Sequence, residues 1–345
     1  MNSTGTPLVS IVLLNYNGGK FLAGCLDSVL DQDYQNVEVI IVDNASTDGS
    51  LDILDDSRYA AFKVIKNPGN EGFSRGMNIG MAMAAGEYVM PLNFDVVMEP
   101  GFITEMVAAA TLDPRVGSVS GKLLRLGDAG KTNVIDSTGH VIFKNRYVIN
   151  RGEDRVDTGK FDRPDFVFGT CGAAPLYKKT MLDDIAWEGQ YYDESFFIML
   201  EDVDIDWRAQ LRGWKCAYTP AAVAYHYRGA TGSGKSRLIQ RHYYKNRHLL
   251  ILKNDSALSY FFHIPVIWLM DLYLDLDILF TAPVALLLAW GDMVRLLPLT
   301  LRKRRITQAG RVTPRAVMEA WFQPYHWLDD VKRKLGLSDK SGRER

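Results

Sequence analysis

Four acidic residues crowd six consecutive positions late in the sequence: Glu201, Asp202, Asp204 and Asp206. They follow the apolar run 196–200 and open a helical pattern, where the helix dipole stabilises negative charge. Asp204 and Arg208 can pair four residues apart, so the segment by itself could be a solvated, capped helix. Because the residues before it are apolar, a carboxylate that emerges here into a cleft is also a candidate general base.

Polar clusters follow three apolar runs in the first hundred residues, at 15–18, 43–48 and 93–95. Turn and N-cap residues would explain any one of them. If the runs are parallel strands, however, all three clusters meet at the edge where such sheets bind ligands. There Asp43 and Asp48 can accept hydrogen bonds from a base or a ribose. Asp95 suits Mg²⁺ or Mn²⁺, which prefer carboxylate oxygens and keep phosphates as further ligands.

Glycines recur along one side of a helical pattern, at Gly69, Gly72, Gly76 and Gly80. They allow close approach to a strand or a phosphate, and the helix N-terminus is expected to offer free N–H groups to an anion. Packing of the helix on a sheet explains Gly76 and Gly80 equally well. His226, at the end of a late apolar run, could add a metal ligand, although a lone histidine is more often structural.

A second phosphate motif competes with this interpretation. Residues 229–236, GATGSGKS, fit the P-loop pattern G-x-x-x-x-G-K-S, so a P-loop ATPase is one alternative. P-loop domains continue as repeated βαβ units, whereas an aromatic, helical region follows here. We therefore interpret the segment as a mobile Gly-rich loop, in which Lys235, with Arg228 and Arg237, could close over a diphosphate.

The elements that must position these residues alternate between strand and helix. Apolar runs predict strands at 8–14, 37–42, 62–65 and 88–92, and helical patterns lie at 20–30, 48–54 and 73–85. Such alternation indicates a parallel sheet covered on both faces, a doubly wound α/β fold. Beyond a Gly- and charge-rich region with broken strand patterns (117–165), we expect helices at 196–211 and 235–252 and short strands at 214–218 and 221–225.

Residues 256–298 differ in character, being dense in Leu, Ile, Phe, Trp and Tyr. Their longest uncharged run, 278–291, is shorter than the roughly 20 residues of a membrane-spanning helix. A basic run follows at 302–305. We predict amphipathic helices that lie in the plane of a membrane surface, with a helical appendage packed on the rest of the chain as the alternative.

Composition narrows the class of protein. The 345 residues are 47% hydrophobic and 23% charged, which suits one large α/β domain with or without a smaller appendage. A net charge of -1 does not favour a nucleic-acid partner. Cys25, Cys171 and Cys216 show no zinc or redox spacing and indicate reduced thiols of a cytoplasmic protein. Residues 1–7 contain no apolar signal core, so we expect no secretion.

Seven segments together carry a family resemblance: VSIVLLNYNG, VEVIIVDNASTDGS, NPGNEGFSRGMNIGM, PLNFDVVMEPG, TCGAAPLYKK, FFIMLEDVDIDWRAQLRGW and AYHYRGATG. In this order and spacing, over residues 7–231, the chain resembles the family 2 glycosyltransferases of the GT-A fold, particularly the bacterial rhamnosyltransferase-like members. The resemblance implies a GT-A α/β fold. It also implies a metal-dependent, inverting transfer of a sugar from a nucleotide diphosphate to an acceptor hydroxyl.

The resemblance further implies roles for individual residues. The nucleotide-binding set is Asn15, Asn17, Asp43, Asn70, Gly72, Phe73 and Asn78. Asp95 and His226 would bind Mg²⁺ or Mn²⁺; because Asn93 replaces the first acid of the family's metal motif, the binding depends mainly on Asp95. Asp202 matches the catalytic base. The acceptor side and lid comprise Gly172, Ala173, Glu201 and Lys235.

We therefore expect a GT-A catalytic domain at 1–232, with a nucleotide-binding half at about 7–98 and an acceptor half at about 99–232, and a helical, membrane-associating tail at 233–345. The expected donor is a dTDP- or UDP-linked sugar, with rhamnose one candidate, and the expected acceptor is a saccharide or a lipid-linked saccharide of cell-surface polysaccharide synthesis. The expected location is the inner face of the cell membrane. A non-catalytic nucleotide-sugar-binding protein is the other alternative, against which Asp95, Asp202 and His226 together argue.

Overall fold

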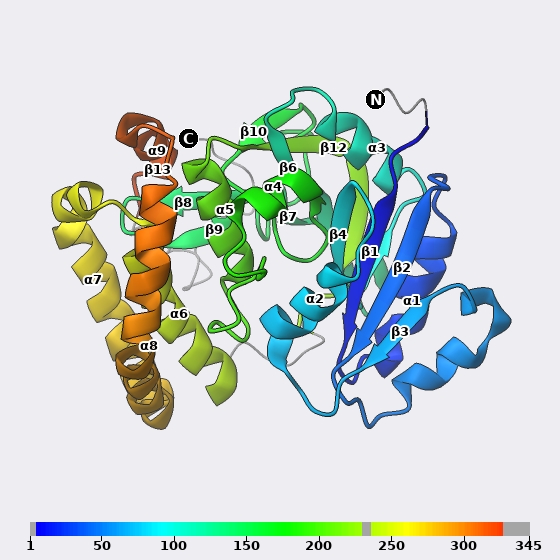
Figure 1. The fold of residues 1–345 in the computed structure, drawn as a ribbon, viewed down its shortest axis with the longest axis horizontal. Coiled ribbons are helices and arrows are strands. Elements are labelled where there is room, and N and C mark those ends of the chain that lie inside the picture. Colours follow the sequence, from blue (N-terminus) through cyan, green and yellow to red (C-terminus); the bar gives the residue numbers. More distant parts are fainter. Residues whose placement is uncertain (1–4, 230–235, 327–345) are drawn as a thin grey trace.

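The computed structural model describes residues 5–229 and 236–326. A central sheet carries helices on both faces, and the helices α6 (Arg237–Asn254), α7 (Ala257–Thr281) and α8 (Pro283–Ala309) gather along one side of the molecule (Figure 1). The other helices are α1 (Gly19–Leu30), α2 (Gly72–Ala82), α3 (Phe102–Ala110), α4 (Lys179–Ile185), α5 (Glu201–Leu211) and α9 (Arg315–Trp321). Residues Ser50–Asp55 and Ser57–Tyr59 form short 3₁₀ helices.

The first half of the sheet is parallel. Strand β1 (Val9–Asn15) lies between β2 (Val37–Asp43) and β4 (Tyr88–Asn93), and β3 (Lys63–Lys66) extends the sheet beyond β2. The register pairs Asn15 with Asp43, and Leu14 with Asn93. The three polar clusters therefore meet at one edge, as the sequence predicted.

The second half of the sheet contains antiparallel strands. Its members are β5 (Val96–Met98), β6 (Val116–Gly127), β7 (Gly130–Ser137), β10 (Asp165–Val167), β11 (Leu176–Lys178) and β12 (Lys215–His226). Strand β11 runs antiparallel to both β4 and β6, while β12 runs parallel to β6. The two short strands expected at 214–218 and 221–225 are one strand, β12, with an irregularity between Tyr218 and Val223. A separate three-stranded sheet contains β8 (His140–Phe143), β9 (Val148–Asn150) and β13 (Phe322–Gln323).

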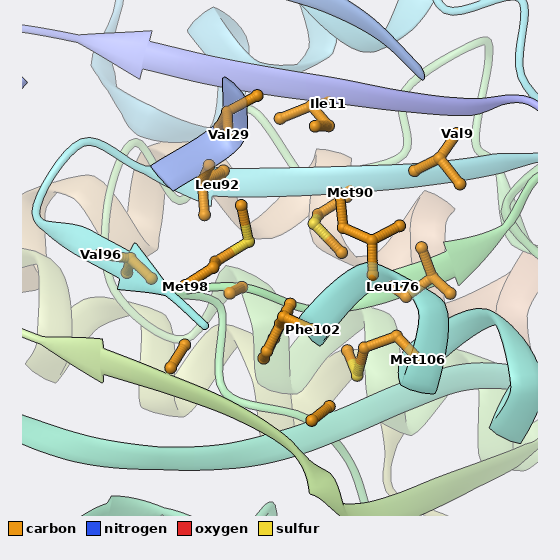
Figure 2. Close-up of a cluster of buried hydrophobic side chains, with 14 of the residues drawn as sticks. Val9, Ile11, Val29, Met90, Leu92, Val96, Met98, Phe102, Met106 and Leu176 are labelled. Carbon is orange, nitrogen blue, oxygen red and sulfur yellow. The ribbon is translucent and has the colours of Figure 1, made fainter. Parts of the chain in front are cut away.

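Alternate residues of β1 enter two different cores. Ile11 and Leu13 belong to one core, to which Phe102 of α3 also contributes, whereas Val12 and Leu14 belong to a second core with residues of α2. Figure 2 shows Ile11 near Val29 and Leu92 in the first core. Helix α2 lies very close to this second face, because a Cβ atom on Gly80 would stand 2.4 Å from Val12 Cγ1. A Cβ on Gly76 would stand 2.5 Å from Leu14 Cδ1, so these two glycines serve helix-on-sheet packing.

A third core joins the late helices to α5. Trp207 and Leu211 of α5 pack with Leu249 of α6 and Met318 of α9. The predicted boundary at residue 232 lies outside the described residues, and the helices that follow it share a core with α5. The division into a catalytic domain and a membrane-associating tail stays a prediction.

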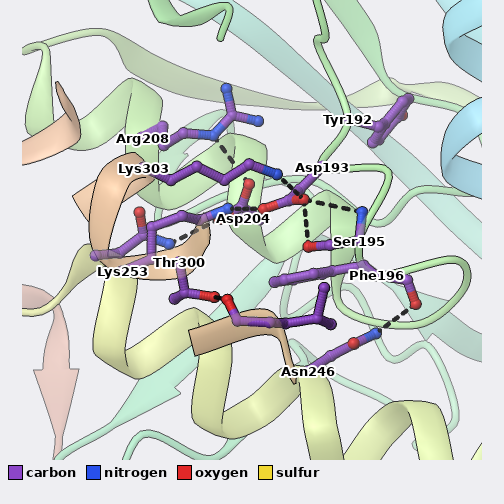
Figure 3. A network of polar contacts seen from close by, with 12 residues as sticks. Tyr192, Asp193, Ser195, Phe196, Asp204, Arg208, Asn246, Lys253, Thr300 and Lys303 are labelled. Atoms are coloured by element: carbon purple, nitrogen blue, oxygen red, sulfur yellow. Dashed lines mark hydrogen bonds and ion pairs between the residues drawn. The ribbon is translucent and has the colours of Figure 1, made fainter. Parts of the chain in front are cut away.

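Buried ion pairs reinforce this junction. Asp193, just before α5, pairs with Lys253 of α6 and Lys303 of α8, and Lys253 also lies 2.8 Å from Asp204 of α5 (Figure 3). Burial would raise the pKa of Asp193, but attraction to the two lysines lowers it. The ionised carboxylate of Asp193 is therefore stabilised by residues that lie far along the chain.

Replacing Lys303 with Met should lower the free energy of unfolding by about 3 kcal/mol, because breaking a buried pair leaves a charge without its full set of partners. The matched control is Arg302→Met on the same helix. Its pair with Glu188 is exposed, so we expect a loss below about 1 kcal/mol. Urea unfolding of both variants checks this expectation, and equal losses would contradict it.

Candidate active site

The side-chain amide of Asn15 connects the ends of β1 and β2 by hydrogen bonds. The buried Nδ2 of Asn15 donates to Asp43 Oδ1 at 2.9 Å and to Ser50 Oγ at 2.9 Å. Asp43 Oδ2 accepts from the Ser46 amide at 3.0 Å, and Asn17 Oδ1 accepts from the Thr47 amide at 2.8 Å. The structure thus brings Asn15, Asn17 and Asp43 together and fixes the carboxylate that sequence analysis assigned to the nucleotide.

The N-terminus of α2 differs from the expectation. The Phe73 and Ser74 amides donate to the carbonyl of Phe197 at 2.7 and 3.1 Å, so the prediction of free N–H groups is wrong for these two. Gly72 has a φ of 79°, and a Cβ there would stand 2.4 Å from the Phe197 ring. This terminus is therefore a docking point for the chain before α5. Asn70 Oδ1 accepts from the Gly72 amide at 2.9 Å and shapes the turn.

Asn78 is also occupied by protein contacts. Its Nδ2 donates to Tyr192 O at 2.9 Å and to Glu194 Oε1 at 3.1 Å, and its Oδ1 accepts from the Tyr192 amide at 2.9 Å. The side chain is buried. Its observed contacts join α2 to the segment 192–194, and its assignment to the nucleotide stays a prediction.

Asp95 and His226 come together at the edge of the sheet. His226 Nε2 lies 3.4 Å from Asp95 Oδ1, and His226 Nδ1 lies 2.8 Å from Asp136 Oδ2. Burial would lower the pKa of His226, but hydrogen bonds to Asp136 and Asp95 raise it to about 9. Arg125 and Arg228 lie 3.1 and 3.2 Å from the other oxygen of Asp136.

This arrangement fits a divalent cation that is completed by phosphate oxygens. A carboxylate and an imidazole nitrogen converge, and the second ring nitrogen of His226 is oriented by the Asp136 carboxylate, an arrangement common around metal-bound histidines. In the two described ranges, no group of three or more His, Cys, Asp or Glu residues could hold a metal by itself. Mg²⁺ is commonly bound by one or two carboxylates together with substrate phosphates, so the donor set is sufficient.

The segment 196–200 does not continue α5, contrary to the predicted helix at 196–211. The helix begins at Glu201, and Phe197, Met199 and Leu200 have φ values of 67°, 76° and 65°. The side chain of Asn246 on α6 donates to the carbonyls of Phe196, Ile198 and Met199 at 3.0, 2.8 and 2.7 Å. These carbonyl groups point at α6 and cannot form helical hydrogen bonds.

Asp202 emerges from the first turn of α5. Its Oδ2 accepts from the Gly172 amide at 2.8 Å, and its Oδ1 accepts from the Val203 amide at 2.8 Å. Ala173, next to Gly172, accepts from the Asn93 amide at 2.9 Å. The Gly172–Ala173 pair therefore connects Asp202 to the strand end that leads into Asp95.

The neighbouring carboxyl of Glu201 has a different environment. Burial and the adjacent Asp202 raise the pKa of Glu201 to about 8. Its Oε2 has no hydrogen-bond partner within the described part of the chain. The carboxyl of Glu201 therefore favours its uncharged form at neutral pH.

Cys171 lies close to both carboxylate groups. Burial raises the pKa of its thiol, and so do the negative charges of Asp136 and Asp202. Cys171 also directly precedes Gly172, whose amide donates to Asp202. Lys235 lies outside the described residues, as does most of the segment 229–236.

Sequence analysis missed Asp136 and His140. Both lie in the region 117–165 that it left as broken strand patterns, on β7 and β8 respectively. The sequence signal that could have pointed to them is the segment Asp136–His140, in which a glycine lies among polar residues. In the structure, Gly139 turns the chain with a φ of 112° and lies between two buried polar residues.

Comparisons with known proteins identify the family of this chain. The sequence profile of the family described as "Glycosyl transferase family 2" matches residues 10–185. "Glycosyltransferase GlyG" of Streptococcus pneumoniae is 36% identical over 103 residues, which cover 28% of this chain and 33% of that protein. "N-acetylglucosaminyl-diphospho-decaprenol L-rhamnosyltransferase" of Mycobacterium tuberculosis is 25% identical over 276 residues, 73% of this chain and 86% of that protein.

Among solved structures, the mannosyltransferase PcManGT of Pyrobaculum calidifontis, in complex with GDP-Man and Mn²⁺, aligns with a TM-score of 0.53 at 16% identity. The alignment covers 97% of this chain and 89% of that chain, and at this identity it shows the fold alone. The match to GlyG spans about a third of that protein. The GT-A fold expected from the sequence is confirmed, and because the family profile matches just over half of its residues, the chain belongs to glycosyltransferase family 2.

Proposed function

We propose that this chain is an inverting glycosyltransferase in which Asp202 takes the proton of the acceptor hydroxyl. The observation that carries the proposal is the placement of Asp202, a partly buried carboxylate on α5 that is linked through Gly172 and Ala173 to the end of the strand that leads into Asp95. A general base must lie within reach of the acceptor hydroxyl beside the donor, and this link supports such a position for Asp202.

The donor would lie along the edge formed by β1, β2 and β4. Asp43 is oriented by Asn15 and Ser46, and its Oδ2 has one acceptor position left for a hydrogen bond from a base or a ribose. Asp95 and His226 would hold Mg²⁺ or Mn²⁺, which would neutralise the charge that develops on the departing diphosphate. PcManGT, which shares the fold, was solved with Mn²⁺ and a nucleotide sugar, and this supports the choice of cation.

Asp202 would act on the acceptor side. As the acceptor oxygen bonds to the anomeric carbon, its proton passes to the Asp202 carboxylate, and the carbon–oxygen bond to the diphosphate breaks. A single displacement of this kind inverts the configuration of the anomeric carbon. Glu201 would be a poor substitute as the base, because burial keeps its carboxyl largely protonated.

The Mycobacterium tuberculosis relative guides the choice of substrates. Its name specifies transfer of L-rhamnose to a lipid-linked diphosphosaccharide, and its alignment covers most of both chains. We propose that this chain likewise uses a lipid-linked saccharide, with dTDP-rhamnose the first donor to test and UDP-linked sugars the next. Lys235, as part of a Gly-rich lid, stays a prediction.

A lipid-linked acceptor requires access to a membrane, and α7 and α8 offer a surface for it. Both helices expose many large apolar side chains, among them Phe261, Phe262, Trp268, Phe280 and Leu287. Exposed apolar surface of this extent marks a site of interaction, and aromatic residues favour the membrane interface. We therefore propose peripheral attachment to the inner face of the cell membrane.

Helix α8 is the one described helix that is long and apolar enough to cross a membrane. Crossing would remove Lys303 from Asp193 and Asp292 from Arg241, two contacts that hold α8 against the rest of the chain. We therefore favour attachment in the membrane plane.

The basic run 302–305 contributes less to attachment than its sequence indicates. Lys303 is buried against Asp193, and Arg304 donates to the carbonyls of Leu252 and Asp255. Arg302 pairs with Glu188. The apolar side chains should therefore dominate membrane binding.

We expect Asp202→Asn to lower turnover of dTDP-rhamnose, with a lipid-linked acceptor, by roughly 10²–10⁴-fold, the usual effect of losing a general base. Donor binding should change little. The matched control is Glu201→Gln, which should lower turnover far less because Glu201 is already largely uncharged. Turnover of the Asn variant within a few-fold of wild type would remove Asp202 from this role.

Chelation should abolish activity, and Mg²⁺ or Mn²⁺ should restore it. Asp95→Ala should weaken binding of the nucleoside diphosphate in the presence of Mn²⁺ by about tenfold or more, since loss of a metal ligand lowers metal affinity. Isothermal titration calorimetry with dTDP and UDP measures this directly. Full activity in EDTA would show that the reaction needs no metal.

The triple variant Phe261→Ser, Phe262→Ser, Phe280→Ser should lose sedimentation with phosphatidylglycerol-containing liposomes, while high salt should weaken the wild-type interaction only slightly. Leu112→Ser is the control, because Leu112 is 73% exposed on another part of the molecule. If wild-type protein stays in the supernatant and the triple variant instead dissociates a dimer in size-exclusion chromatography, the surface binds a second copy.

A further inference from the structure

One buried histidine outside the predicted site faces the proposed base. His140, the first residue of β8, places Nδ1 2.9 Å from Asp206 Oδ2 and Nε2 3.6 Å from Asp202 Oδ2. Asp202 and Asp206 stand four residues apart on α5 and so point to the same side of the helix. The imidazole therefore bridges two carboxylates of a single helix.

The surrounding backbone is shaped to hold this bridge. Gly169 leaves the space that Asp206 occupies, because a Cβ atom there would stand 1.8 Å from Asp206 Oδ2. The carbonyl of Gly169 accepts from the His140 amide at 2.8 Å, and the Thr170 amide donates to Asp206 Oδ2 at 3.0 Å. The same short segment thus fixes both the carboxylate and the histidine.

We propose that His140 is a positioning residue for Asp202. Held by Asp206, it places ring Nε2 3.6 Å from Asp202 Oδ2, where an imidazole N–H attracts the negative charge of that carboxylate and keeps it oriented. The inference rests on the proposed role of Asp202 as the base. It adds a residue of the second sheet to a site that is otherwise built from α5 and the main sheet.

The electrostatics of the pair support this arrangement. Burial would lower the pKa of His140, but Asp202 and Asp206 raise it, against an opposing effect of Arg228. Burial raises the pKa of Asp206 to about 7 despite its hydrogen bond with His140. Both shifts favour the protonated form of each group. When the ring carries both of its hydrogens, or when Asp206 carries its proton and donates it to Nδ1, an N–H at Nε2 faces Asp202.

During transfer, His140 would keep its protons. The acceptor's O–H bond breaks and its proton goes to Asp202, the acceptor oxygen bonds to the anomeric carbon, and the electron pair of the broken sugar–oxygen bond leaves with the diphosphate. Before this step Nε2 of His140 would stand 3.6 Å from one Asp202 oxygen and attract it. Its contribution therefore lies in orienting the base and attracting its negative charge.

The activity test compares His140→Phe, which removes the N–H, with His140→Gln, which can still donate. With dTDP-rhamnose and a lipid-linked acceptor, the Phe variant should lose about tenfold or more in kcat, with little change in donor KM. The acid limb of its pH–rate profile should move up by about one unit, because the ionised base has lost a stabilising donor. The Gln variant should recover most of kcat. His248→Gln, on α6, is the control and should keep the wild-type profile.

Equal losses in the Phe and Gln variants, with an unchanged pH profile, would overturn the proposal and leave His140 a packing residue. Thermal unfolding of both variants distinguishes that result from global destabilisation. The isosteric variant Asp206→Asn provides a second route, and it should reduce kcat while leaving the fold intact.

A measurement without substrate separates this inference from the proposed function. Long-range ¹H–¹⁵N spectra of the histidine rings in full-length protein should show His140 titrating at lower pH in Asp202→Asn than in wild type, because a negative neighbour has been removed. The midpoint should fall by at least about half a unit. An unchanged midpoint would show that the two side chains are not coupled. A shifted midpoint without any sugar transfer would instead count against the proposed reaction.

Discussion

The position of Asp202 depends on the side chain of Asn246. The amide of this α6 residue faces three carbonyl groups of the segment 196–199, and this segment leads directly into the first turn of α5. Phe197, Met199 and Leu200 adopt left-handed conformations, each of which costs about 1–2 kcal/mol for a residue with a side chain. Hydrogen bonds of about 1 kcal/mol each to Asn246, and those from the α2 amides to Phe197, offset that cost.

This constraint makes the late helices part of the site that we propose for catalysis. Helix α6 contacts the segment that precedes Asp202. Lys253 and Lys303 pair with Asp193, which lies N-terminal to that segment, and Phe197 within it packs on the N-terminus of α2. The apolar surface of α7 and α8 is therefore attached to the same helices that fix Asp202. A membrane bound at that surface would contact helices that also position Asp202. Removing these helices would therefore disturb both Asp202 and the proposed membrane attachment.

The sequence predicted the parallel half of the fold well, because its signals are local. Continuous apolar runs and the polar residues that end them placed Asn15, Asp43 and Asp95 at one edge, and the register confirmed it. The segment before α5 was predicted as helix because Phe196–Leu200 has helical composition. In the structure, its conformation depends on hydrogen bonds from Asn246, about fifty residues away along the chain. No local sequence pattern encodes that contact. The positions of Asp136 and His140 in the site were not predicted for a similar reason, because their partners His226 and Asp206 lie on distant elements.

The central claim is that one edge of the sheet holds a nucleoside diphosphate and a metal beside Asp202. A crystal structure of the protein with Mn²⁺ and dTDP, or with UDP, tests it most directly. We expect the base or ribose within hydrogen-bonding distance of Asp43, Mn²⁺ on Asp95 and His226 with both phosphates as further ligands, and Asp202 free of the metal on the side where an acceptor would enter. A nucleotide bound elsewhere, a metal absent from Asp95, or Asp202 acting as a metal ligand would contradict it.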